Sequence, residues 1–214
     1  VSVMDYAANG YLPEAMLNYL ARLGWSHGDD ELFSAEQMVA WFDGAHLSKS
    51  PAQWDPAKLD WVNGHYVKQI DETRLAVLVV QQLAARGIQV TEADVLPKVG
   101  LFKDRCPTVA VLADWLAMYF APVSPSAEEL ATHLTDAVRP AVSVLAGKLA
   151  ALGAWDKASI QQALKETLAA TGLKMPQLAV PVRVLVCGRA QTPSLDAVLE
   201  HFDQKKVLER LQAV

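Results

Sequence analysis

The chain has 214 residues, of which 52% are hydrophobic and 20% charged, and its formal net charge at pH 7 is −5. This length suffices for one large domain or two small ones with a sizeable core. No stretch approaches the roughly 20 consecutive apolar residues that a membrane-spanning helix needs. Cys106 and Cys187 lie far apart, which favours two ordinary thiols over a disulfide, and no cysteine–histidine cluster has zinc-site spacing.

The charge is unevenly distributed along the chain. Residues 1–130 contain 9 basic and 17 acidic side chains, whereas residues 131–214 contain 10 basic and 7 acidic ones. The acidic total argues mildly against a nucleic-acid partner, and the more cationic C-terminal part softens that argument.

Hydrophobic residues at helical spacing predict helices along almost the whole chain. The first runs from Leu12 to Leu23, with Pro13 in its first turn and Gly24 at its end. Ser34 and Gln37 form a capping-box pattern ahead of a second helix. Asp55 and Pro56 are typical of the start of a third helix, and we expect Leu59 and Trp61 of this helix to pack in the protein core.

The later helices are predicted from their capping residues, breakers and apolar positions. Five of these helices are expected to begin, in chain order, at Thr73 (ending at Gly87), Thr108 (ending before Pro122), Ser126 with Glu129, Pro140 and Thr192-Pro193. Two more are marked by their apolar residues, Ile160 to Leu168 (ending at Gly172) and Val207–Leu211. The one ambiguous stretch is Leu178–Cys187, whose β-branched residues suggest a strand although Pro181 would be awkward in a central strand. The residues alone leave strand and helix open for this stretch.

Two short connections predict boundaries between units. They are Gln69–Thr73 and the proline-rich Ala121–Pro125. We therefore expect three units, at residues 1–70, 71–123 and 124–214.

Three segments in a fixed order carry a family resemblance. They are Pro13–Trp25 (PEAMLNYLARLGW), Leu47–Tyr66 (LSKSPAQWDPAKLDWVNGHY) and Arg183–Leu211 (RVLVCGRAQTPSLDAVLEHFDQKKVLERL). Together they resemble the C-terminal half of the bacterial glutamyl-tRNA synthetases. The resemblance implies an all-α fold, with a stem-contact helical unit (1–70) followed by two helical anticodon-binding subdomains (71–123 and 124–214). It also implies that Leu178–Cys187 is a helix that is entered at Pro181.

The same resemblance implies a function. The chain would bind tRNA(Glu) and present its anticodon, as a cytoplasmic monomer with no membrane association. In the family, a segment like Val1–Tyr6 follows the lysine-rich loop that stabilises ATP phosphates, so we expect ATP and Mg to be used by a catalytic half outside this chain. We expect no catalytic residue, metal or cofactor in the chain itself, and its start without methionine fits a fragment.

The segment His46–Ser50 (HLSKS) looks like the phosphate-stabilising signature loop of class I synthetases. We reject that interpretation because no glycine-rich phosphate cradle precedes it and no parallel strand pattern supports it. The alternative is that Ser50-Pro51 begins a turn or helix and that Lys49 is exposed.

The resemblance also implies specific tRNA contacts. Lys49, Lys58 and Asn63 would touch the backbone or sugars of the tRNA stem. Arg105, in Leu101–Pro107 (LFKDRCP), is the leading candidate for reading an anticodon base, because an arginine fork can hold a base edge or stack on a flipped base. The alternative is an ordinary exposed Asp104–Arg105 pair.

Arg183 and Arg189 would contact the anticodon from the second subdomain. The chain departs from the family pattern at Cys187, where a hydroxyl residue is common, and at His201–Asp203, where a Leu-Gly pair is usual. The second departure replaces a glycine suited to the left-handed conformation, which puts the last turn in doubt. We expect Cys187 to be a buried thiol and not a nucleophile. A helical protein–protein interaction module without RNA binding remains the alternative function.

Overall fold

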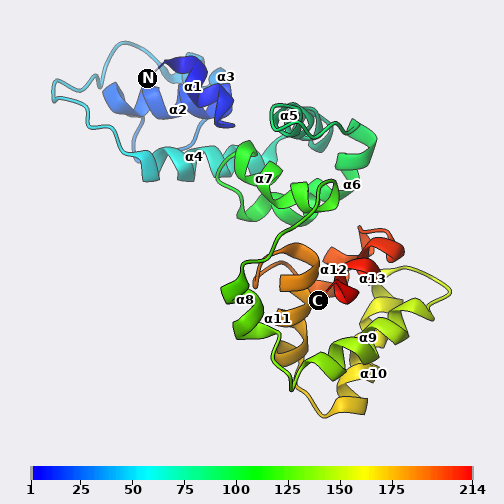
Figure 1. The fold of residues 1–214 in the computed structure, drawn as a ribbon. Helices are drawn as coiled ribbons and strands as arrows, with labels where there is room; N and C mark the ends of the chain where they lie inside the picture. Colours follow the sequence, from blue (N-terminus) through cyan, green and yellow to red (C-terminus); the bar gives the residue numbers. More distant parts are fainter. Residues whose placement is uncertain (1, 214) are drawn as a thin grey trace. The chain divides into compact units, whose positions relative to one another are not determined.

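The computed structural model describes residues 2–213, and these form helices without any strand. Only two isolated β-bridges occur among them, Trp25 with Leu47 and His27 with Asp30. The predicted all-α fold is therefore confirmed. The helices form two compact units, Val1–Ala117 and Met118–Val214 (Figure 1). The finer division at residue 70 stays a prediction.

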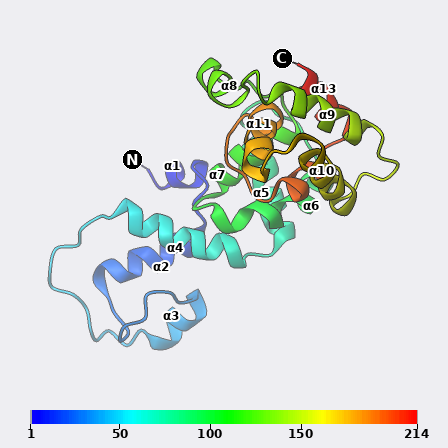
Figure 2. The same ribbon diagram turned by 90° about the horizontal axis from the view of Figure 1, so that it is seen from below.

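The first unit is built around two sets of packed helices. Helix α5 packs against α6 and α7. Helix α2 packs along α4, as Figure 2 shows. The bounds of its elements are α1 Val3–Ala8, α2 Pro13–Gly24, α3 Ala35–Trp41, α4 Pro56–Gln69, α5 Glu72–Ala84, α6 Glu92–Phe102, the 3₁₀ turn η1 Lys103–Arg105, and α7 Val109–Leu116.

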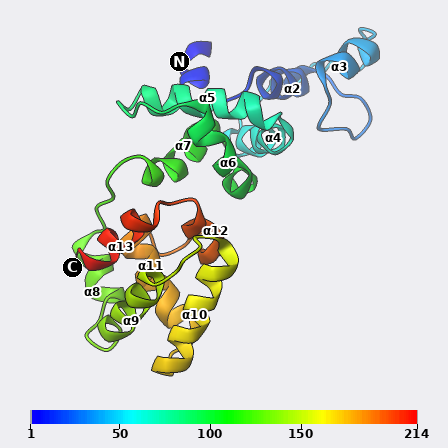
Figure 3. The same cartoon turned by 90° about the vertical axis from the view of Figure 1, so that its right-hand side faces the viewer.

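The second unit places α9 against both α10 and α13, and α11 against α8 and α13 (Figure 3). A 3₁₀ turn, η2 (Ala117–Tyr119), lies at its start. The bounds of its helices are α8 Ala127–His133, α9 Arg139–Ala150, α10 Lys157–Thr171, α11 Met175–Cys187, α12 Leu195–Glu200 and α13 Gln204–Gln212. Helix α11 supplies much of the core, since eight of its thirteen residues are buried.

Most of the predicted helix starts are confirmed. The capping boxes at Ser34 and Ser126 are both formed, and the Asp55 carboxylate accepts hydrogen bonds from the N–H groups of Ala57 and Lys58. Thr73 is wrong as an N-cap. The carboxylate of Asp71 caps α5 instead, because it accepts from the N–H groups of Thr73 and Arg74 at 2.9 and 3.2 Å.

The helical prediction for Leu178–Cys187 is confirmed, but its start is wrong. Helix α11 begins at Met175, with Pro176 in the first turn, and Pro181 lies inside it. The buried surroundings of Pro181 supply packing that offsets the backbone hydrogen bond its ring nitrogen does not donate. Helices α1 and α6 were not predicted at all.

The absence of a glycine from His201–Asp203 does not distort the turn between α12 and α13. His201 ends α12 with φ −83° and ψ −7°, and Asp203 precedes α13 with φ −64° and ψ 136°. Among the described non-glycine residues, only His46 has a positive φ. This turn therefore has no left-handed position for a glycine to fill.

Candidate nucleic-acid interface

Arg105 lies at the end of a tight turn that α6 positions. Thr91 caps α6 by accepting from the N–H of Asp94, and the helix ends at the buried Phe102. The chain then tightens into η1, closed by a hydrogen bond from the N–H of Cys106 to the carbonyl of Lys103 at 3.1 Å. The turn leaves the Arg105 side chain exposed.

One face of the Arg105 guanidinium rests against an aromatic ring. Its central carbon lies 5.7 Å from the centroid of the half-buried Trp115 ring on α7. A guanidinium in this position is attracted by the negative face of the indole. The contact holds the fork of N–H donors at the surface, and it involves Trp115, which the sequence did not single out.

Lys58 and Lys49, the predicted stem contacts, have different surroundings. The Lys58 ammonium lies 2.7 Å from a carboxylate oxygen of Glu31 and 4.3 Å from the centroid of the Trp61 ring. The hydrogen bond from Lys58 lowers the pKa of Glu31 and so favours the charged form of this carboxylate. Lys49 is exposed in the connection between α3 and α4, and Ser50-Pro51 does not begin a helix.

Trp61 does not pack in the core as predicted. Its exposed fraction is 49%, whereas Leu59, two residues earlier on α4, is 1% exposed. The two positions point to different faces of the helix, and only that of Leu59 is covered.

Asn63 is placed where it has no access to a ligand. Its side chain is fully buried, and its amide oxygen accepts from the Leu12 N–H at 2.8 Å. Its amide nitrogen donates to the carbonyl of Pro107 at 2.6 Å and to that of Gly10 at 3.4 Å. This burial contradicts a direct tRNA contact by Asn63, whose amide instead joins α4 to two other segments of the first unit.

Arg183 and Arg189 flank the end of α11 in the second unit. The Arg183 Nε donates to the hydroxyl of Thr192 at 2.9 Å, which orients the guanidinium along the helix surface. Gly188 ends α11 in the left-handed conformation, with φ +72°, and turns the chain into Arg189. Both arginines are half-buried.

Cys187 is a buried thiol, as predicted. It is 3% exposed and unpaired with Cys106, and burial raises its pKa to about 12 despite the nearby positive charges of Arg210, Arg183 and Arg189. A thiol that stays protonated at neutral pH is a poor nucleophile.

Arg210 supports this end of the second unit and was missed by the sequence analysis. Its guanidinium donates to the carbonyls of Met118, Val186 and Ala121 at 2.9, 2.7 and 3.1 Å. It thereby ties α13 to the end of α11, to η2 and to the segment that follows η2. Its acceptors are up to 92 residues away in sequence, so no local pattern signals this role.

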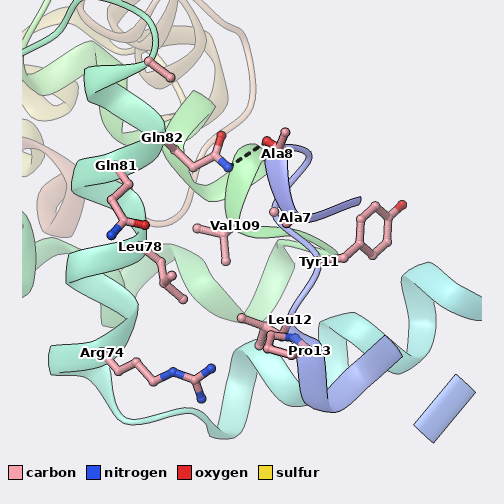
Figure 4. Close-up of a pocket in the computed structure, with 12 residues that line it drawn as sticks. Ala7, Ala8, Tyr11, Leu12, Pro13, Arg74, Leu78, Gln81, Gln82 and Val109 are labelled. Carbon is pink, nitrogen blue, oxygen red and sulfur yellow. Dashed lines mark hydrogen bonds between the residues drawn. The ribbon is translucent and has the colours of Figure 1, made fainter. Parts of the chain in front are cut away.

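A separate hollow lies in the first unit beside α5 (Figure 4). Its lining is mostly apolar, including Leu12, Leu78 and Val109, and its volume is about 420 Å³. Gln82 closes one side by donating to the carbonyl of Ala8 at 2.9 Å, as drawn in Figure 4. Arg74, at the opposite end, forms an ion pair with Glu14. None of the predicted tRNA-contacting residues lines this hollow.

No group of three or more histidine, cysteine, aspartate or glutamate side chains within residues 2–213 is arranged to hold a metal ion. None of the helices described here has both the length and the apolar character needed to cross a bilayer.

The fold and sequence now define the class of the protein. Residues 36–214 match the family model described as "Anticodon binding domain", and the chain belongs to this family. Residues 1–61 also match the model for "tRNA synthetases class I (E and Q), catalytic domain".

The relatives are glutamate–tRNA ligases, of which the chain matches the C-terminal part. It is 58% identical over 213 residues to "Glutamate--tRNA ligase" of Leptothrix cholodnii and 58% identical to that of Paracidovorax citrulli. These alignments cover 99% and 98% of this chain but 46% and 44% of the relatives, so the chain spans about half of their length.

The fold is also that of solved structures. A glutamate tRNA ligase from Elizabethkingia meningosepticum, crystallised in complex with its amino acid, matches 95% of this chain and 41% of its own with a TM-score of 0.85. A glutamate–tRNA synthetase from Elizabethkingia anophelis matches with a TM-score of 0.82. Both are 24% identical to this chain. The resemblance to this family that the sequence predicted is confirmed.

Proposed function

We propose that this chain binds tRNA(Glu) and recognises its anticodon arm, within a glutamate–tRNA ligase that uses ATP and Mg elsewhere in the protein. The observation that carries the proposal is the match of residues 36–214 to the anticodon-binding family, together with relatives that are glutamate–tRNA ligases. The alternative of a protein–protein interaction module has no support in the comparisons. We also propose that the protein acts in the cytoplasm as a monomer.

Arginine and lysine side chains supply the chemistry that the proposal needs. The exposed Arg105 presents its guanidinium from the η1 turn of the first unit, while the half-buried Arg183 and Arg189 lie near the end of α11 in the second. Arginine guanidinium groups stack on unpaired bases and donate pairs of hydrogen bonds to base edges and phosphates. Lys49 is proposed as a backbone contact, and Lys58 as one that gives up part of its pairing with Glu31. Asn63 is withdrawn as a contact because it is buried.

The test compares Arg105 variants on different transcripts. If Arg105 reads an anticodon base, Arg105→Ala weakens binding of tRNA(Glu) by about 1–3 kcal/mol, and the loss shrinks on transcripts whose first or third anticodon nucleotide is already substituted. Arg105→Lys retains the charge but loses the planar fork, so it also shows a defect. The measurement is fluorescence or filter binding.

Lys58→Ala is the matched comparison. If Lys58 contacts a phosphate, its loss lowers the affinity for all transcripts alike and reduces the salt slope of binding by about 1. If Arg105→Ala and Arg105→Lys both bind every transcript like the wild type, Arg105 is an ordinary surface residue and base recognition must be sought at Arg183 and Arg189.

A further inference from the structure

A groove of about 350 Å³ lies between α4 and the η1 turn of the first unit. Helix α4 packs against η1, and a Cβ at Gly64 would lie 3.5 Å from the Cα of Pro107, an ordinary van der Waals distance. The groove is lined by Asp60, Trp61, Gly64, His65 and Lys68 of α4 and by Asp104, Arg105, Cys106 and Pro107 of the opposite wall.

Both walls of this groove are fixed by hydrogen bonds. Asn63 of α4 donates to the carbonyl of Pro107 at 2.6 Å, which joins the two walls directly. The Cys106 thiol donates to the carbonyl of Phe102 at 3.2 Å, so the second wall is also tied to the end of α6. A groove held in this way loses little conformational freedom when a ligand enters it.

The groove combines three kinds of recognition group. Trp61 is 49% exposed, and its indole ring, over which the Lys58 ammonium lies 4.3 Å from the centroid, is large enough for a planar group to stack on it. Lys68 and Arg105 are exposed cations, and the central carbon of the Arg105 guanidinium lies 5.7 Å from the centroid of the Trp115 ring. His65 lies between Trp61 and Lys68 on the same helix and is half-buried.

The two carboxylates of the groove differ in their partners. Asp60 accepts a hydrogen bond from the Tyr11 hydroxyl at 2.5 Å. Burial and this hydrogen bond raise the pKa of Tyr11 to about 12, so the hydroxyl remains a donor at neutral pH. Asp104 is exposed beside Arg105. A carboxylate repels a free phosphate, but it accepts hydrogen bonds from the amino groups of a base or from a ribose hydroxyl.

A stacking surface, two cations and a carboxylate acceptor match the parts of one nucleotide: its base, its phosphate and its N–H or O–H donors. We infer that the groove between α4 and η1 receives one unpaired nucleotide of the bound tRNA, with its base against Trp61 and within reach of the Arg105 guanidinium, and its phosphate toward Lys68. This inference rests on the proposed function. It adds Trp61 and Lys68 to the contacts, and it gives α4 a role in recognising the RNA through a residue that the sequence had placed in the core.

The experiment measures binding of a tRNA(Glu) transcript to the whole chain by fluorescence anisotropy. Trp61→Ala is expected to weaken binding about tenfold, in keeping with the stacking of one base. Trp61→Phe keeps an aromatic face and should recover most of that loss. Lys68→Ala should reduce the salt slope of binding by about 1. Trp54→Ala is the control for loss of an exposed tryptophan, because Trp54 is 39% exposed and does not line the groove.

A second readout locates the contact. Acrylamide should quench the fluorescence of Trp61 in the free protein. The contribution of Trp61 is the difference in quenching between the wild type and Trp61→Phe. This difference should disappear when tRNA is added. Lys165→Ala, an exposed lysine of α10, is the control for Lys68. Circular dichroism of each variant confirms that it is folded.

The outcomes separate the two proposals. If Arg183→Ala weakens tRNA binding while Trp61→Ala and Lys68→Ala bind with wild-type affinity and salt slope, the groove proposal is overturned and tRNA binding stands. If the wild-type chain shows no salt-dependent binding of the transcript, the proposed function fails and the groove proposal fails with it.

Discussion

At the residue scale, the polar side chains of the segment Trp61–Tyr66 hold the first unit together. Asn63 bonds to three backbone groups, and the Tyr66 hydroxyl lies 2.6 Å from the carbonyl of Phe33 and 2.9 Å from the amide oxygen of Asn18. The residues of the same segment that face solvent are the ones available to a ligand. A motif that resembles an RNA-binding family thus contains both framework and contact residues, and burial distinguishes them.

Asn63→Ala tests this distinction. The substitution leaves the N–H of Leu12 and the carbonyl of Pro107 without their partner, so we expect the free energy of unfolding to fall by about 2–4 kcal/mol. Asn9→Ala, at an exposed position, should change it by less than about 0.5 kcal/mol. Urea unfolding followed by circular dichroism measures both. A loss for Asn63→Ala no larger than that for Asn9→Ala would show that its hydrogen bonds contribute little.

At the element scale, the ends of two helices depend on glycine. Gly172 after α10 and Gly188 after α11 have almost the same left-handed φ, +71° and +72°. Their surroundings differ, because a Cβ at Gly172 would meet open space and one at Gly188 would lie 3.2 Å from the Cβ of Val123. The pair therefore separates the cost of the backbone conformation from the cost of crowding.

Gly172→Ala should lower the free energy of unfolding by about 1 kcal/mol, the cost of an alanine in the left-handed region. Gly188→Ala should cost about 1 kcal/mol more, because Val123 and the connection that carries it must move. Because Gly188 precedes Arg189, we also expect weaker tRNA binding for Gly188→Ala alone. Urea unfolding and transcript binding are the measurements, and equal effects of the two substitutions would rule out the crowding.

Capping residues and helical periodicity were enough to predict most of the helices. Helix α6 was missed although Thr91 and Asp94 form a capping box, because a proline such as Pro97 normally indicates the end of a helix. Helix α1 was missed because it is six residues long and buries none of them. Asn63 and Trp61 were misassigned because their exposure depends on which face of α4 the rest of the unit covers. That information lies in tertiary contacts.

At the scale of the whole molecule, each unit contributes its own cations to the proposed function. Arg105 and Lys68 belong to the first unit, and Arg183 and Arg189 to the second, where Arg210 fixes the end of α11. The formal net charge is nevertheless −5. An acidic protein that binds a polyanion must do so through local cationic contacts, and such contacts release counterions from the RNA.

The most direct test of tRNA binding is therefore its dependence on salt. The affinity of the chain for a tRNA(Glu) transcript should fall linearly on a plot of log K against log salt concentration, with a slope of roughly −0.7 to −0.9 for each phosphate contacted. Combining Arg105→Ala, Arg183→Ala and Arg189→Ala should make the slope less steep. A chain that does not bind the transcript, or that binds it with an affinity independent of salt, would contradict the account.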